Sequence, residues 1–124
     1  GGRMLCAFGG RFERYAQVAV IVSIQNSCAY CVDAHMMMLD SMGIDAGNIE
    51  NNLDALGLNE KEKLLFNLAR EINKNSTKVE DKLFETLRLN NVDIEEILEI
   101  IGVVELFVGY NLFLNAMDIP GGNL

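Results

Sequence analysis

Asn-Ser-Cys-Ala-Tyr-Cys-Val-Asp-Ala-His, residues 26–35, holds two of the three cysteines of the chain and its only histidine. If the stretch is helical, Cys28 and Cys31 lie one turn apart, and His35 lies one turn beyond Cys31. All three side chains then project from one face of the helix. The spacing therefore predicts a dithiol with a proton carrier within reach.

The residues before the first cysteine are suited to start this helix. Asn26 or Ser27 can act as the cap, which would place Cys28 in the first turn. Unpaired backbone N–H groups and the positive end of the helix dipole favour a thiolate over a thiol there. His35, at the (i, i+4) spacing from Cys31, can stabilise or generate a thiolate at that second cysteine.

Three interpretations of the stretch are open. The first is two buried cysteines and a core histidine, since free cysteine is often buried. The second is a zinc site with Cys6 as the fourth ligand, which is disfavoured because the sequence has no second C-x-x-C or histidine pair to complete a structural tetrahedron. The third, a redox dithiol, is favoured because the C-x-x-C spacing, the cap and the only histidine coincide.

The run from Cys28 to His35, following a mostly apolar helix and an asparagine, resembles the signature of the carboxymuconolactone decarboxylase / alkylhydroperoxidase D-like family. Three later segments, 42–44, 58–62 and 92–100, are similar in order and spacing to the peroxidase-related branch of that family. The resemblance covers the chain from about Tyr15 onward. It implies an all-helical protein without an organic cofactor, which reduces hydroperoxides or passes electrons through a cysteine pair and assembles as a homotrimer or homohexamer.

One position departs from the family pattern. Members with peroxidase activity usually carry a proton-relay glutamate twelve residues before the first cysteine, and Ala16 occupies that position here. Glu13 lies one helical turn before Ala16 on the same side. Glu105 lies inside an apolar helix, where burial would raise its pKa into a useful range, and it is slightly favoured. The predicted catalytic residues are Cys28, Cys31, His35, Glu105 and Glu13.

The mechanism that the resemblance implies begins with Cys31, assisted by His35, attacking a hydroperoxide and becoming a sulfenic acid. Cys28 condenses with it to a disulfide, which an external dithiol or thioredoxin-like reductant reduces. The two cysteines could exchange roles, because the helix N-terminus favours Cys28 as the low-pKa thiol. Two other functions are open: a non-redox decarboxylase or lyase of the same family, and an oligomeric redox-sensing module without turnover.

Composition limits the class of protein. The chain has 124 residues, a formal net charge of −8 and a single proline, which predicts one all-α domain over residues 1–124. The acidic excess lies in residues 41–124, and no basic patch suits nucleic acid or an anionic membrane surface. Nothing at the N-terminus resembles a signal peptide, so we expect a cytoplasmic protein whose disulfide is transient.

Apolar periodicity and caps predict about six helices. Asn59 with Glu62, and Asp93 with Glu96, form capping boxes, and Thr77 is a further cap. The expected helices cover roughly residues 11–25, 28–42, 45–57, 59–72, 77–87 and 94–117.

The first and last of these helices are unusually apolar. The first should be buried on all sides. The last is long enough to raise the question of a membrane span, but Glu99, Glu105 and Asn111 lie inside it, so we expect a soluble helix buried on most sides. Their combined apolar surface exceeds what a domain of this size covers by itself, which predicts an obligate oligomer.

Overall fold

The computed structural model describes residues 6–9, 12–45, 47, 49 and 56–118, and within these residues it contains helices and no strand. The all-α prediction is confirmed. The elements are the 3₁₀ helix η1 (Cys6–Phe8) and the α-helices α1 (Phe12–Gln25), α2 (Ala29–Ser41), α3 (Glu60–Asn75), α4 (Asp81–Leu89) and α5 (Ile94–Ala116).

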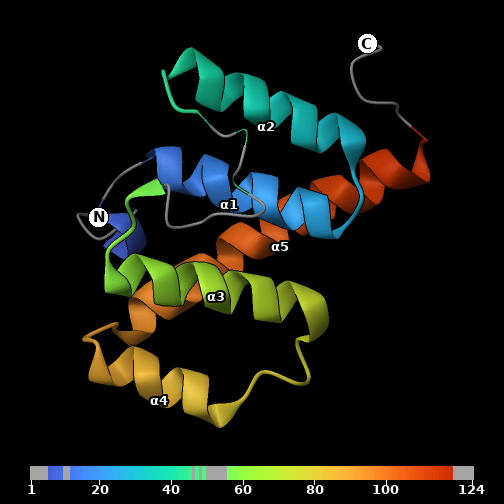
Figure 1. The fold of residues 1–124 in the computed structure, drawn as a ribbon. Helices are drawn as coiled ribbons and strands as arrows, with labels where there is room; N and C mark the ends of the chain where they lie inside the picture. The colour runs from blue at the N-terminus through green and yellow to red at the C-terminus, as the bar shows by residue number, and fades with distance from the viewer. Residues whose placement is uncertain (1–5, 10–11, 46, 48, 50–55, 119–124) are drawn as a thin grey trace.

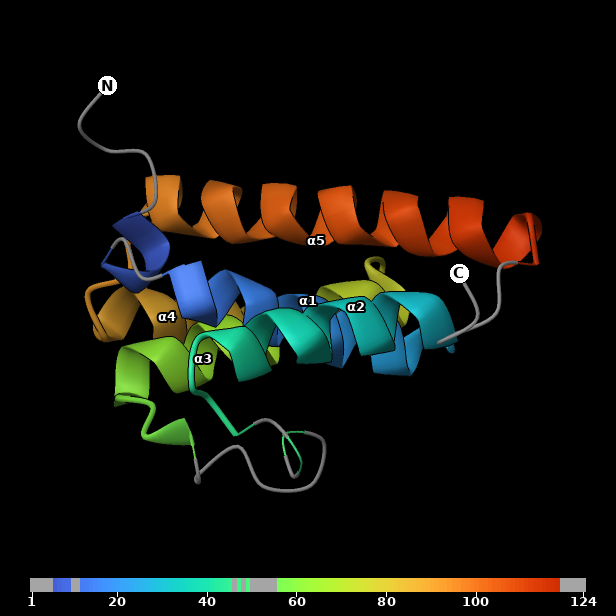
Figure 2. The same cartoon turned by 90° about the horizontal axis from the view of Figure 1, so that it is seen from above.

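Helix α1 is the centre of the molecule and packs against α2, α3 and α5. Helix α2 runs back along α1 in the opposite direction, and α3 and α4 lie on the other side of α1 (Figure 1). Helix α5 forms a layer by itself across one side of the molecule (Figure 2). The short turn between α1 and α2 places the cysteines at the start of α2 beside the last turns of α1. The end of α5 bonds to the same turn through Asn111 and Asn115.

The apolar, β-branched centre of α1 is helical although its local propensity also suits a strand. Every residue from Arg14 to Ser23 is buried. Neighbours on all sides supply the core, including Leu65, Phe66 and Ile100. Burial therefore decides the conformation of this segment over local propensity, and the prediction of a helix buried all round is confirmed.

Both predicted capping boxes are present. The Glu62 N–H donates to Asn59 Oδ1 over 2.8 Å, and the Asn59 N–H donates to Glu62 Oε1 over 3.1 Å. Asp93 and Glu96 exchange the same pair of bonds at the start of α5. These reciprocal bonds fix where α3 and α5 begin.

Two smaller predictions are corrected. Thr77 does not cap α4, which begins at Asp81 after Glu80. The N–H and hydroxyl of Thr77 instead donate to Asn75 Oδ1, closing a turn. The helix predicted over 45–57 falls largely outside the described residues. Its described members are Asp45, Gly47, Ile49, Leu56 and Gly57, and none of these five lies in an α-helix.

Helix α5 is not buried on most sides within this chain, contrary to the prediction. One face packs inward through Ile97, Ile100, Val104 and Asn111. The outward face exposes 54–67% of seven large apolar side chains, Ile94, Leu98, Leu106, Tyr110, Leu112, Phe113 and Met117. We call these seven residues the outer face of α5.

By length and composition, α5 is the one helix in the described part of the chain that could cross a membrane, a criterion that core helices of soluble proteins also meet. The acidic residue Glu99 is held inside the fold, where it accepts hydrogen bonds from the Tyr15 hydroxyl and from the Ala7 N–H. This half of α5 is thereby tied to η1 and α1.

Candidate active site at the start of helix α2

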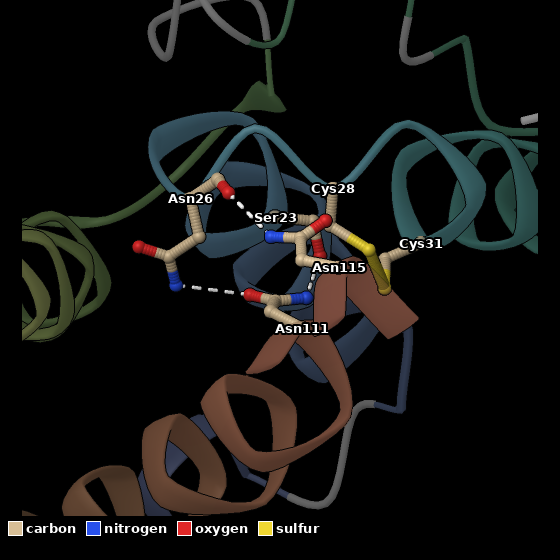
Figure 3. The surroundings of a disulfide bond; sticks show 6 residues. All are labelled: Ser23, Asn26, Cys28, Cys31, Asn111 and Asn115. Atoms are coloured by element: carbon tan, nitrogen blue, oxygen red, sulfur yellow. Dashed lines mark hydrogen bonds between the residues drawn. A yellow bond between two sulfur atoms is a disulfide. The ribbon is translucent and has the colours of Figure 1, made fainter. Parts of the chain in front are cut away.

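Cys28 and Cys31 form a disulfide, with their Cα atoms 5.3 Å apart (Figure 3). This separation lies within the normal range for disulfides, so the expected geometry of the C-x-x-C pair is confirmed. Both residues are almost completely buried, with 1% of Cys28 and 3% of Cys31 exposed. The sulfurs are therefore enclosed by the fold rather than displayed on its surface.

The start of α2 differs from the prediction in one respect. Cys28 itself is the N-cap and makes no side-chain cap bond, so the prediction that Asn26 or Ser27 is the cap is wrong. Cys31, rather than Cys28, lies in the first turn. The Cys28 N–H donates to the Ser23 carbonyl over 3.0 Å, which joins α2 tightly to the end of α1. Both cysteines still lie at the positive end of the helix dipole, which stabilises a thiolate at either one.

His35 lies one turn beyond Cys31, and its ring packs edge-on against Phe107 of α5 with centroids 5.0 Å apart. The Nδ1 atom is buried and has no hydrogen-bond partner among the residues that the structure describes. Burial lowers the pKa of His35 below its ordinary value of 6.5, so the ring is neutral at pH 7 in the disulfide state. Two roles were predicted for His35: to generate the Cys31 thiolate by accepting its proton, or to stabilise that thiolate as a cation. A neutral imidazole can accept a proton from a thiol, so the structure favours the first role.

The two predicted carboxylates lie elsewhere. Glu105 is exposed, so the burial that was predicted for it is absent. It precedes Phe107 by two residues, or about 200° around the helix, and so projects away from the side that contacts His35. Glu13 is half-buried in the first turn of α1, about 18 Å along that helix from Gln25, next to the turn that leads to Cys28. Neither carboxylate therefore lies beside the disulfide.

Beside the disulfide, α5 contributes polar side chains that the sequence did not predict as part of the site. Asn111 Nδ2 donates to Ser23 Oγ over 3.1 Å, and Asn111 Oδ1 accepts from Asn26 Nδ2 over 3.0 Å. Asn115 Nδ2 donates to the Asn26 carbonyl over 2.9 Å. We call Ser23, Asn26, Asn111 and Asn115 the asparagine cluster (Figure 3). The signal available in the sequence was Asn-x-x-x-Asn within an otherwise apolar helix.

The geometry does not provide a metal site in the part of the chain that is described. No three His, Cys, Asp or Glu side chains there are grouped so that they could hold a metal ion. Two of the proposed zinc ligands are already bonded to each other as a disulfide. The zinc interpretation therefore gains no support from these residues.

Comparison with models of known protein families and with curated proteins gives no match to this sequence. Among solved structures, the chain is similar to an uncharacterized peroxidase-related protein from Silicibacter sp. TM1040, with a TM-score of 0.74 and 22% sequence identity. The similarity covers 89% of this chain and 61% of that chain, so this chain spans about three fifths of its neighbour's length. At this identity the likeness shows a shared fold, that of a peroxidase-related protein.

Proposed function

We propose that this chain is a thiol-based oxidoreductase that reduces hydroperoxides through Cys28 and Cys31, with His35 carrying the proton. The observation that carries the proposal is the disulfide at the start of α2, with the only histidine of the chain one turn further along the same helix. The peroxidase-related fold and the resemblance to the alkylhydroperoxidase D-like family support it.

In the first step, neutral His35 accepts the proton of the Cys31 thiol. The thiolate attacks the terminal oxygen of the hydroperoxide, a sulfur–oxygen bond forms and the oxygen–oxygen bond breaks. Cys31 becomes a sulfenic acid, oxidised by two electrons, and the leaving alkoxide takes the proton from His35 to become an alcohol. The helix N-terminus stabilises the thiolate from which the step begins.

In the second step, the Cys28 thiol attacks the sulfenic sulfur, and water leaves as the disulfide forms. The structure corresponds to this product state, since Cys28 and Cys31 are bonded. An external dithiol of the thioredoxin-like class returns the pair to the thiol state by supplying two electrons and two protons. Because Cys28 also lies at the helix N-terminus, the reverse assignment of attacking and resolving cysteine uses the same chemistry.

A second function is supported by burial. The two cysteines are nearly inaccessible, and neither Glu13 nor Glu105 lies beside them. These features suit a redox-sensing module that forms its disulfide slowly and does not turn over. The two functions differ in turnover, since only an enzyme consumes many equivalents of hydroperoxide when a dithiol is supplied.

The test uses the reduced protein with one equivalent of an organic hydroperoxide. We expect the loss of two thiols and a mass decrease of about two hydrogens per chain, as disulfide formation requires. Cys28→Ser should accumulate a sulfenic acid on Cys31 that a dimedone probe captures, and Cys31→Ser should leave no trappable sulfenic acid. Capture on Cys28 in Cys31→Ser would reverse the roles.

The double variant Cys28→Ser, Cys31→Ser is the matched control, since it keeps only Cys6. If wild-type thiols disappear no faster than those of this control, the proposed function is wrong. Disulfide formation without continued hydroperoxide consumption in the presence of a dithiol would identify the sensing module instead.

We also propose that the outer face of α5 is covered by other copies of the chain, as a homotrimer or homohexamer. A stable interface buries about 800 Å² on each partner, whereas the largest exposed apolar patch on a monomer is typically about 300–600 Å². The outer face of α5 has seven large apolar residues, each more than half exposed. A surface of this extent suits a stable interface better than the ordinary apolar patch of a monomer. Sedimentation of the wild type should therefore give a trimer or larger.

The double variant Leu98→Gln, Leu106→Gln should sediment as a smaller species than the wild type. Leu89→Gln is the matched control, because Leu89 is at least as exposed as Leu98 and Leu106 but lies on α4. A wild-type monomer at micromolar concentration would contradict the proposed assembly. An unchanged size of the double variant would place its interface elsewhere.

A further inference from the structure

The turn that connects α1 to α2 controls where Cys28 lies. It consists of Asn26 and Ser27, and Ser27 has a φ of 54°, in the left-handed region. This conformation is unfavourable for a residue with a side chain. Such a turn persists only when bonds from the surrounding structure hold it.

Backbone bonds to α1 close this turn. Side-chain bonds to Asn26 come from Asn73 of α3 and from two asparagines of α5, which lie 85 or more residues away in the sequence. Asn115 Nδ2 donates to the Asn26 carbonyl, and Asn111 Oδ1 accepts from the Asn26 side chain. Asn111 is only 1% exposed. Burying an amide this completely is unfavourable unless it is hydrogen-bonded. The Asn111 amide bonds to Ser23 and Asn26, the residues that hold or form this turn.

Ser23 completes the connection to the disulfide. Its hydroxyl accepts from Asn111, and its carbonyl accepts from the Cys28 N–H over 3.0 Å. The backbone of Cys28 is thus fixed from both sides: through the Asn26 turn before it and through Ser23 beneath it. Asn111 and Asn115 belong to α5, whereas the two cysteines lie at the start of α2. Figure 3 shows these asparagines next to the disulfide.

We propose that Asn111 and Asn115 are positioning residues of the dithiol site. They hold the turn between α1 and α2 so that the Cys28 sulfur stays within bonding reach of Cys31. The proposal rests on the cycling of this pair between dithiol and disulfide, as in the proposed function, but not on hydroperoxide as the oxidant.

The expected consequence concerns the equilibrium between the two redox states. The protein disulfide and two molecules of reduced glutathione give the protein dithiol and one molecule of oxidised glutathione. If the turn is loosened, the dithiol state gains conformational freedom that closure of the disulfide must remove. The equilibrium therefore shifts toward the dithiol, by about three- to tenfold for one net hydrogen bond lost from the closed state.

The experiment measures this equilibrium constant in glutathione buffers for the wild type, Asn111→Leu and Asn115→Ala. Leucine matches asparagine in size but makes no hydrogen bond. We expect a shift of about tenfold for Asn111→Leu and about threefold for Asn115→Ala. Asn115 is exposed, so we expect Asn115→Ala to fold. This variant decides the question if Asn111→Leu fails to fold.

Val104→Ala is the matched control for lost stability, because Val104 is a buried residue of the same helix without a bond to the turn. It should destabilise the fold and leave the glutathione equilibrium within twofold of the wild type. Equilibrium constants within twofold of the wild type for both asparagine variants, or an equal shift in Val104→Ala, would overturn the proposal. A wild type that cycles with glutathione but does not react with hydroperoxide would instead remove the proposed function and leave this inference standing.

Discussion

Two polar clusters lie at opposite ends of α1, each around a buried polar side chain, Arg14 in one and Asn111 in the other, and they are built differently. Near its start, Arg14 donates from Nε to Glu62 over 2.9 Å, and also donates to Gln17 and to the Leu56 carbonyl. Near its end, the asparagine cluster joins α1 to α5 through amides and one hydroxyl. Arg14 and Ser23 are nine residues apart, or about 14 Å along the helix. One cluster is charged and the other, beside the disulfide, is neutral.

The difference bears on the chemistry of the thiols. A buried charge near a thiol shifts its pKa and changes the balance between thiol and disulfide. Amides fix positions through hydrogen bonds and add no net charge. Because the cluster at this end of α1 is neutral, the helix N-terminus and His35 are the groups that act on the pKa of the Cys28 and Cys31 thiols. The charged cluster, at the far end, fastens α1 to α3 without disturbing the site.

The largest expected effect comes from breaking the charged cluster. Glu62→Gln leaves the buried Arg14 guanidinium without its carboxylate partner, which should lower the free energy of unfolding by about 3 kcal/mol. Because this cluster lies far from the disulfide, the glutathione equilibrium should stay within twofold of the wild type. Urea unfolding of the oxidised protein and glutathione titration measure the two quantities.

Asn111→Leu is the matching change at the other end of α1. There we expect the redox shift described above, with a smaller loss of stability of about 1–3 kcal/mol, the usual cost of unpaired buried polar groups. If Glu62→Gln moves the glutathione equilibrium as far as Asn111→Leu, the two ends are coupled and the contrast between them fails.

The capping boxes and the disulfide show which contacts the sequence could predict. The capping boxes at Asn59 and Asp93 were predictable because both partners lie within four residues of each other. The disulfide was predictable for the same reason, since C-x-x-C spacing in a helix is a local property. For these pairs, whose partners are close in the sequence, local rules were sufficient.

Predictions that depended on distant partners fared differently. Asn26 was expected to cap α2, but Asn73 of α3 and Asn111 of α5 engage its side chain instead. The acids of α5 illustrate the same limit. Glu99 points inward and bonds to Tyr15, whereas Glu105, six residues later, is exposed. An apolar helix in a sequence does not reveal which of its acids faces the core, because that depends on elements packed against it.

The smallest expected effect concerns His35, which lies one turn beyond Cys31 on α2. Burial lowers the pKa of His35 in the fold below 6.5, the ordinary value that the unfolded chain retains. Between these two values the unfolded chain binds more protons than the folded chain, so stability rises with pH across this window. The contribution of His35 is complete above about pH 6.5 and is lost as the pH falls toward the folded value. It should be small, because part of the ring faces solvent.

The measurement compares the free energy of unfolding of the oxidised wild type with that of His35→Gln from pH 5 to pH 7.5. The difference removes the titration of carboxylates, which both proteins share. The wild type should lose stability relative to the variant as the pH falls below 6.5. Reduction should weaken this dependence, because a thiolate at Cys31 attracts a proton to the imidazole and opposes the effect of burial. A wild type that gains stability relative to the variant at low pH would show His35 to be charged in the fold, and proton transfer from Cys31 would then need another acceptor.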